Sequence, residues 1–209
     1  MEELSTEHER LLEALRGLPE LQSSWLLLAL CANPRANYYL RALPPSQSAP
    51  FAARHDAALN RALSALLDDP VAPEPELRRA AHVSQLPLRF GGLGLRCATR
   101  LAPAAYWASW CDCLPMIQQR HPGLAAFFGE SLSLPKEAEA MADCLQEARR
   151  ARTTLLSDGY EDCPTWPQVM QGARQRQPVP AEPGDWAHGW QFWAAQACPG
   201  AGAPGGGAT

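Results

Sequence analysis

Four short patterns in this 209-residue sequence contain residue types that carry out chemistry in other proteins. Paired glycines cradle nucleotide phosphates, and paired cysteines bind metal ions or exchange disulfides. A histidine beside a carboxylate acts as a base, and paired carboxylates hold catalytic metal ions. The four patterns are Gly92-x-Gly94, Cys111-x-Cys113, His55-Asp56 and Asp68-Asp69.

The spacing of the glycines and cysteines favours structural roles. The third glycine of a dinucleotide-binding loop would fall at position 97, where the chain has Cys97, and no strand, helix and downstream acidic residue surround the pair as that loop requires. The single residue between Cys111 and Cys113 is the wrong spacing for a zinc site or a redox pair, and no second Cys/His pair lies nearby. We predict a structural turn, core thiols, and no metal or other cofactor.

The histidine and the acidic pair also lack a catalytic setting. His55 and Asp56 are adjacent on a predicted helix, so their side chains diverge by about 100°, and we predict a solvated or capping pair on its outward face. Asp68 and Asp69 end a helix before Pro70, whereas a polymerase metal site needs acids fixed on rigid strands. No set of nucleophile, base and metal ligands remains, which predicts a chain that is not an enzyme and has no small-molecule substrate.

Helical periodicity runs through most of the chain and predicts a mostly α fold, an irregular multi-helix domain. The predicted helix over residues 21–31 is apolar nearly all round, which indicates burial. Shorter helices are predicted to begin at the caps Asn33 and Thr165, and prolines at 115, 122 and 135 are predicted to break the chain into short pieces. The longer predicted helices cover residues 5–18, 21–31, 48–67, 74–84, 99–112 and 136–156.

Residues 85–112 are predicted to form the centre of the fold. Glycines at 91, 92 and 94 lie between apolar residues, a pattern typical of one buried tight turn or short hairpin. In the helix that follows, Pro103 is tolerable only in the first turn, where little backbone hydrogen bonding is lost. Small residues at helical spacing allow close neighbours, so this helix is predicted to be packed on several sides.

Composition changes toward the C-terminus and predicts the domain limits. A helical domain covers residues 1–173, a polar proline-rich linker 174–185, a tryptophan-rich helical segment 186–198, and a disordered Gly/Ala tail 199–209.

The cysteines and the N-terminus predict an intracellular protein, cytoplasmic or nuclear. The seven cysteines are an odd number at wide intervals, and the first residues are acidic and polar rather than a signal peptide, so reduced, buried thiols are expected. The longest apolar run, residues 25–32, is too short to span a bilayer, so no membrane association is predicted.

One electrostatic feature points to nucleic acid. The net charge is −4, yet residues 34–100 carry nine arginines against five acids, about +4, which leaves about −8 for the rest of the chain. Asn37, Tyr38, Tyr39 and Gln85 accompany these arginines, so the segment could contact phosphates while its rings stack on bases. An ordinary solvated face has the same composition and is the alternative interpretation.

Several phrases of the sequence occur together, in this order and spacing, in one known family. They are Cys31-Ala-Asn-Pro-Arg-Ala-Asn-Tyr-Tyr-Leu-Arg-Ala-Leu-Pro-Pro, Phe51-Ala-Ala-Arg-His-Asp, Leu86-Pro-Leu-Arg-Phe-Gly-Gly-Leu-Gly-Leu, Ala104-Ala-Tyr-Trp-Ala-Ser-Trp and Gly189-Trp-Gln. They resemble the region just after the polymerase domain in non-LTR (LINE-like) retrotransposon reverse transcriptases, with the closest likeness to the copies abundant in dinoflagellate and other algal genomes. The proline-glycine phrase is the most specific part.

The resemblance implies a helical thumb-and-linker segment without the catalytic part. In that family a fingers-and-palm polymerase with a Tyr/Phe-x-Asp-Asp metal site comes first, and a Cys/His module and an endonuclease often follow the linker. Here Leu66-Leu67 precede Asp68-Asp69 in place of the palm motif, and the Cys/His module and nuclease carboxylates are missing. Without paired carboxylates nothing holds the two metal ions of polymerase chemistry.

The leading hypothesis is a noncatalytic fragment of a reverse transcriptase-like protein whose ancestral role is to contact RNA or an RNA–DNA hybrid. A second is a helical protein–protein interaction module with an exposed aromatic patch around Trp186, Trp190 and Trp193, and a third is a retroelement relic without selected function. If residues 25–32 packed on a lost palm, an exposed apolar face is expected. The candidate nucleic-acid-binding residues are Arg35, Asn37, Tyr38, Arg41, Arg89 and Arg96.

Overall fold

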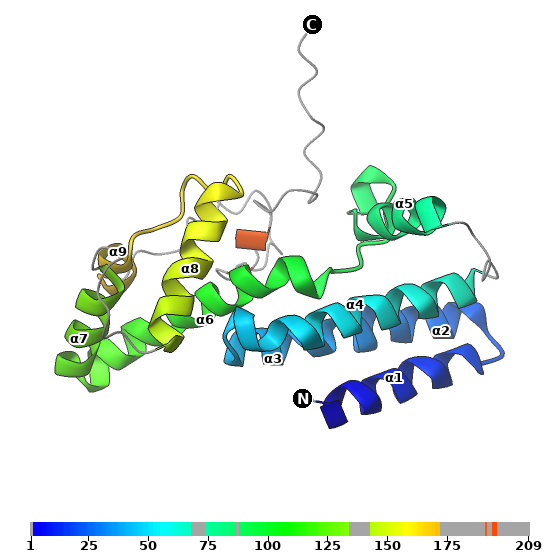
Figure 1. Cartoon of the computed structure of the whole chain (residues 1–209), viewed down its shortest axis with the longest axis horizontal. Coiled ribbons are helices and arrows are strands. Elements are labelled where there is room, and N and C mark those ends of the chain that lie inside the picture. Colours follow the sequence, from blue (N-terminus) through cyan, green and yellow to red (C-terminus); the bar gives the residue numbers. More distant parts are fainter. Residues whose placement is uncertain are drawn as a thin grey trace, which may run out of the picture. The chain divides into compact units, whose positions relative to one another are not determined.

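The protein is mostly α, as the periodicity predicted (Figure 1). The computed structural model describes residues 2–67, 74–86, 88–133, 143–171, 191 and 194–195, and these ranges contain no strand. The predicted limits at 173, 185 and 198, the tryptophan patch, the Gly/Ala tail and Asp68-Asp69 lie outside these ranges, so those predictions stay predictions.

The chain divides into two compact units. Unit 1 contains Met1–Leu40, Gln47–Ala102 and Pro199–Thr209, and unit 2 contains Arg41–Ser46 and Pro103–Cys198. The candidate phosphate-binding residues fall mainly in unit 1.

Unit 1 is built around leucines of α1 (Glu2–Arg16) and of α4 (Pro45–Leu66), whose helices run side by side with α2 (Leu21–Leu27) in Figure 1. On α1 and α4 these leucines recur at three- and four-residue spacing, so each helix has one apolar face. Burying such a side chain contributes about 1.5–3 kcal/mol, which makes this cluster the main source of stability in the unit. Its buried leucines are Leu12, Leu15, Leu28, Leu59, Leu63 and Leu95.

The chain stays helical from α2 through Asn33, where a new cap was predicted. A π-helical turn (Leu28–Ala32) and a 3-10 turn (Asn33–Arg35) lead directly into α3 (Ala36–Ala42). Pro34 has no N–H to donate, and the ladder shifts register before it, with the Asn33 N–H donating to the Leu28 carbonyl. The cap prediction for Asn33 is therefore wrong. Its side chain is turned to another part of the unit, as shown below.

One face of α2 and the π-turn is exposed, although burial all round was predicted. Leu28 is fully buried, whereas Leu26, Leu27 and Leu30 are 45%, 41% and 69% exposed. Within unit 1 the core cluster covers only the side that carries Leu28 and Ala32. An exposed apolar face was expected if residues 25–32 packed on a lost palm, and such a face is present.

The glycine-rich stretch is a tight turn rather than a hairpin. A 3-10 turn (Leu88–Phe90) follows α5 (Glu74–Gln85), Gly91 and Gly94 have φ of 77° and 69°, and the Gly94 N–H donates to the Leu86 carbonyl at 2.9 Å. The turn was predicted to be buried, but its tip is open: Leu88 is 75% exposed. The glycines are needed for backbone conformation and not for burial of the loop.

The helix after this turn, α6 (Ala98–Arg120), is longer than predicted. It continues through Pro115, and Pro103 is its sixth residue, outside the first turn. Ala102, Ala105 and Trp107 of α6 are buried, so packing on several sides offsets the hydrogen bonds that the two prolines remove.

Unit 2 packs the second half of α6 with α7 (Pro122–Ser133), α8 (Asp143–Ser157) and α9 (Trp166–Met170). The predicted cap Thr165 is confirmed, because it forms a capping box with Gln168. The predicted helix over 136–156 is described from residue 143 onward, and Glu147 within it accepts the Ser46 N–H at the start of α4 at 3.1 Å.

The described cysteines are all free, but they are not all core thiols as predicted. Cys111 is buried whereas Cys113, two residues further along α6, is exposed, because such positions face nearly opposite sides of a helix. Cys31 and Cys144 are exposed too.

Candidate nucleic-acid interface

Asn33 brings together two exposed arginines that are far apart in the sequence. Its side-chain NH2 donates to the Arg96 carbonyl at 3.0 Å, and its Oδ1 accepts the Arg96 N–H at 3.1 Å. Asn33 is only 6% exposed, so both bonds are shielded from water. Arg35 lies in the 3-10 turn that Asn33 begins, so the residues that carry Arg35 and Arg96 share one fixed junction.

Two adjacent residues of α4 form hydrogen bonds to the segments that meet at this junction. His55 Nε2 lies 3.2 Å from the Asn33 carbonyl, so Nε2 carries the proton and donates. Asp56 accepts the N–H groups of Ala98 and Thr99 at 2.7 and 3.0 Å and thereby caps α6. The prediction that both residues face outward is wrong for His55, which is 2% exposed, while the capping alternative is confirmed for Asp56.

The guanidinium groups of Arg35 and Arg96 are open to solvent and form no ion pair with the described residues. Some other arginines of unit 1 are engaged: Arg54 pairs with Glu9 at 3.2 Å, and the half-buried Arg100 donates to Gln85. The exposed Arg10, Arg61 and Arg79 resemble Arg35 and Arg96 in forming no ion pair with the described residues. Arg35 and Arg96 therefore keep their donors available for an external anion.

The pKa of His8 is affected by the positive charge of Arg35. The pKa of His8 is lowered to about 4, mainly by burial and also by the nearby His55 and Arg35, against an opposing effect of Glu9. Burial also lowers the pKa of His55, opposed by Asp56 and by its bond to the Asn33 carbonyl. Both imidazoles are therefore neutral at pH 7, and the cationic charge at this site is that of arginine.

A series of rings runs from the surface of unit 1 into its core. Tyr38 is 73% exposed, and its ring lies edge-on to Tyr39 at 5.4 Å between centroids. Tyr39 contacts Phe51 at 5.3 Å, Phe51 lies 5.9 Å from His55, and His55 stacks on His8 at 4.4 Å. The exposed ring of Tyr38 therefore contacts the half-buried Tyr39, which in turn contacts the buried Phe51.

The remaining candidates are placed less favourably. Arg41 belongs to unit 2, where it donates to Asp112 at 2.7 Å and to Gln191 at 3.2 Å, so its guanidinium is occupied. Asn37 is half-buried. The side chain of Arg89 lies outside the described part of the chain.

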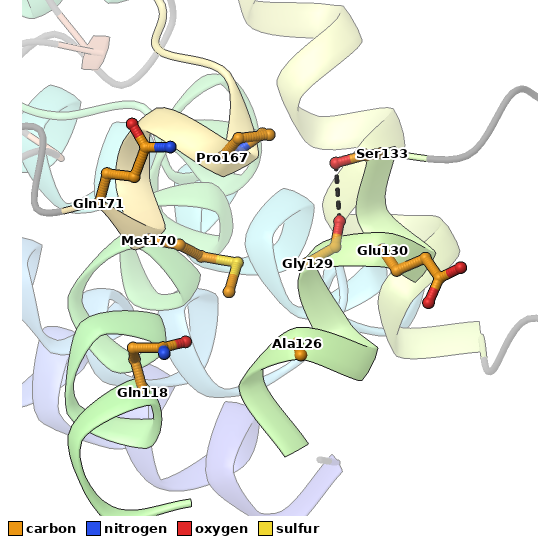
Figure 2. Close-up of a pocket in the computed structure, with 8 residues that line it drawn as sticks. All are labelled: Gln118, Ala126, Gly129, Glu130, Ser133, Pro167, Met170 and Gln171. Carbon is orange, nitrogen blue, oxygen red and sulfur yellow. Dashed lines mark hydrogen bonds between the residues drawn. The ribbon is translucent and has the colours of Figure 1, made fainter. Parts of the chain in front are cut away.

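Unit 2 contains a separate open pocket of about 560 Å³ between α6, α7 and α9 (Figure 2). Met170 projects into it toward Gly129, and Ser133 Oγ donates to the Gly129 carbonyl at 2.7 Å. The lining residues are Gln118, Ala126, Gly129, Glu130, Ser133, Pro167, Met170 and Gln171.

The described residues contain no group of three or more His, Cys, Asp or Glu side chains placed to hold a metal ion. None of the helices within these ranges is long and apolar enough to cross a membrane.

The chain is similar to one protein of a mobile genetic element. It is 29% identical over 121 residues to the "Retrotransposable element SLACS 132 kDa protein" of Trypanosoma brucei gambiense, a stretch that is 57% of this chain and 10% of that protein. No family model and no solved structure matches the chain. The predicted relation to retrotransposon proteins is confirmed in this general form.

Sequence reasoning missed the residues that assemble the site. Asn33, His55 and Asp56 were interpreted as a local cap and a surface pair, yet each bonds to a segment distant in the sequence. The sequence signal was position: Asn33 directly precedes the Pro34-Arg35 pair. The π-helical turn before Asn33, a feature frequent at functional sites, is visible only in the structure.

Proposed function

We propose that this chain is a noncatalytic part of a reverse transcriptase-like retroelement protein and contacts RNA or an RNA–DNA hybrid through unit 1. The observation that carries the proposal is the Asn33 junction, which fixes the backbone segments that carry two exposed arginines without an ion pair among the described residues. Binding costs less conformational entropy when the contacting groups are held in advance.

The chemistry of the two arginines fits a phosphate backbone. A guanidinium is always charged and presents a planar fork of donors that matches phosphate oxygens. Phosphate contacts account for most hydrogen bonds in protein–nucleic acid complexes and do not depend on base sequence. The proposed contact is therefore electrostatic and without sequence preference.

The assignment to the part after the polymerase rests on the phrases of the sequence and is supported by the similarity to a retrotransposable element protein. The matched stretch is a tenth of that relative, so the polymerase carboxylates would belong to another part of a longer protein. The proposed role of this part is to hold the nucleic acid.

The experiment is a fluorescence anisotropy titration of labelled RNA and RNA–DNA hybrid at about 50 and about 200 mM salt. Arg35→Ala and Arg96→Ala should each weaken binding about 3- to 10-fold and lower the slope of log affinity against log salt by about 1. Arg120→Ala is the matched control, because Arg120 is exposed in unit 2 and forms no ion pair with the described residues. Equal effects of all three variants, or absence of binding by folded protein, would refute the proposal.

A second candidate function is protein–protein interaction through the exposed leucines of α2 and the π-turn. Leu26, Leu27 and Leu30 form a contiguous apolar face, and such faces mark contact sites on soluble proteins. This face replaces the predicted tryptophan patch as the supporting observation, because the patch lies outside the described residues. Pull-down of a partner by the wild-type chain and not by Leu30→Gln would favour this function.

A further inference from the structure

A contact with phosphate alone would leave the exposed Tyr38 of unit 1 without a role. A tyrosine normally buries most of its ring, yet Tyr38 is 73% exposed. It lies three residues after Arg35, at a spacing that puts two side chains next to each other on a helical surface. The exposed ring and the unpaired guanidinium are therefore neighbours.

The ring is supported rather than loose. Tyr38 contacts Tyr39 edge-on at 5.4 Å, and Tyr39 in turn contacts the buried Phe51 at 5.3 Å. Edge-to-face pairs of this kind contribute about 0.5–1.5 kcal/mol beyond buried area and limit ring rotation. The part of the ring that Tyr39 does not cover stays open to solvent.

We propose that unit 1 binds single-stranded nucleic acid, with one unpaired base stacked on Tyr38 while Arg35 holds an adjacent phosphate. This inference rests on the proposed function and specifies its ligand. In a duplex both faces of each base are covered by neighbouring base pairs, so only an unpaired base can offer a face to a protein ring. Stacking is available to every base, which suits a site without base-specific donors.

The test compares three ligands of equal length: single-stranded RNA, the RNA–DNA hybrid, and an abasic strand that keeps the phosphates. Tyr38→Ala should weaken binding of single-stranded RNA at least about fivefold, and leave the hybrid and the abasic strand within about twofold. Tyr38→Phe should bind like the wild type, since the ring and not the hydroxyl makes the contact. Leu21→Ala is the control, because Leu21 is an exposed side chain (59%) of the same unit, at the start of α2.

The outcomes separate this inference from the proposed function. If the abasic strand binds as tightly as single-stranded RNA, or if Tyr38→Ala weakens all three ligands alike, the stacking inference is overturned and the phosphate contact stands. If none of the ligands binds in a salt-dependent way, both are overturned. Tyr38 is exposed and its ring contacts Tyr39, so Tyr38→Ala should melt within a few degrees of the wild type, which excludes unfolding as the cause of weaker binding.

Discussion

At the scale of single residues, His8 and His55 show how unit 1 depends on neutral imidazoles. Both rings are buried and stacked, and neither ring nitrogen of His8 has a hydrogen-bond partner among the described residues. A proton on His8 would add a buried charge close to Arg35, with Glu9 as the opposing charge. The folded state therefore favours the neutral ring.

This arrangement predicts a loss of stability in mild acid. The pKa of His8 is about 4 in the folded chain and 6.5 when exposed, so between these values only the unfolded chain binds the proton. Stability is fully present above about pH 6.5 and decreases toward pH 4, by on the order of 2–3 kcal/mol from His8. His8→Phe keeps a stacked ring and should show a smaller drop in the urea midpoint between about pH 7 and about pH 5.

The matched control is His121→Phe, because His121 is exposed in unit 2. It should keep the pH dependence of the wild type. The same drop in His8→Phe as in the wild type would mean that His8 does not control the acid response, and His55 would then be the next residue to replace.

At the scale of elements, helices were predictable from local signals and the contacts at their ends were not. The leucine spacing of α1 and the capping box of α9 involve residues three or four apart, which sequence shows directly. Asp56 caps α6 from 42 residues away, and Asn33 bonds to Arg96 across 63 residues. The site depends on these long-range contacts, so the sequence predicted Arg35 and Arg96 as candidates without showing that Asn33 joins the segments that carry them.

The exposed face of α2 was mispredicted for a related reason. An all-apolar helix is buried only when other elements surround it, and this depends on tertiary packing that periodicity does not encode. The same limit explains Pro103 and Pro115, whose cost is offset by the packing of α6 and not by its local sequence.

The glycine turn gives a prediction at this scale. A Cβ at Gly92 would lie 2.0 Å from the Leu86 carbonyl oxygen, so Gly92→Ala requires the backbone of the turn to move. We expect a loss of about 2 kcal/mol or more in the free energy of unfolding. Gly123→Ala is the control, because a Cβ there meets nothing within 4 Å and α7 should gain about 0.5–1 kcal/mol.

Opposite signs for these two variants in urea unfolding would show that Gly92 is required for close backbone approach. Equal stability of Gly92→Ala and the wild type would mean that the turn adopts another conformation in solution.

At the scale of the whole molecule, the similarity and the exposed leucines support the same interpretation. The matched stretch is 10% of its retrotransposable element relative. On the proposal that the chain is part of a longer protein, it would expose the surface through which it contacts the rest. Leu26, Leu27 and Leu30 of unit 1 are exposed apolar side chains of this kind, next in sequence to the junction that carries Arg35.

If this face binds another protein and is not needed for folding, its leucines should be replaceable without loss of stability. The triple variant Leu26→Gln/Leu27→Gln/Leu30→Gln should keep the melting temperature within a few degrees, because exposed side chains contribute little to stability, and should bind less of a hydrophobic dye such as ANS. Leu28→Gln in the same helical run is fully buried in the wild type and should lose about 2–5 kcal/mol. Comparable destabilisation of both variants would show that the exposed leucines pack within the chain in solution. If only the triple variant keeps its fold, the wild-type chain has an apolar face that its stability does not require. That is the property expected of an interaction surface.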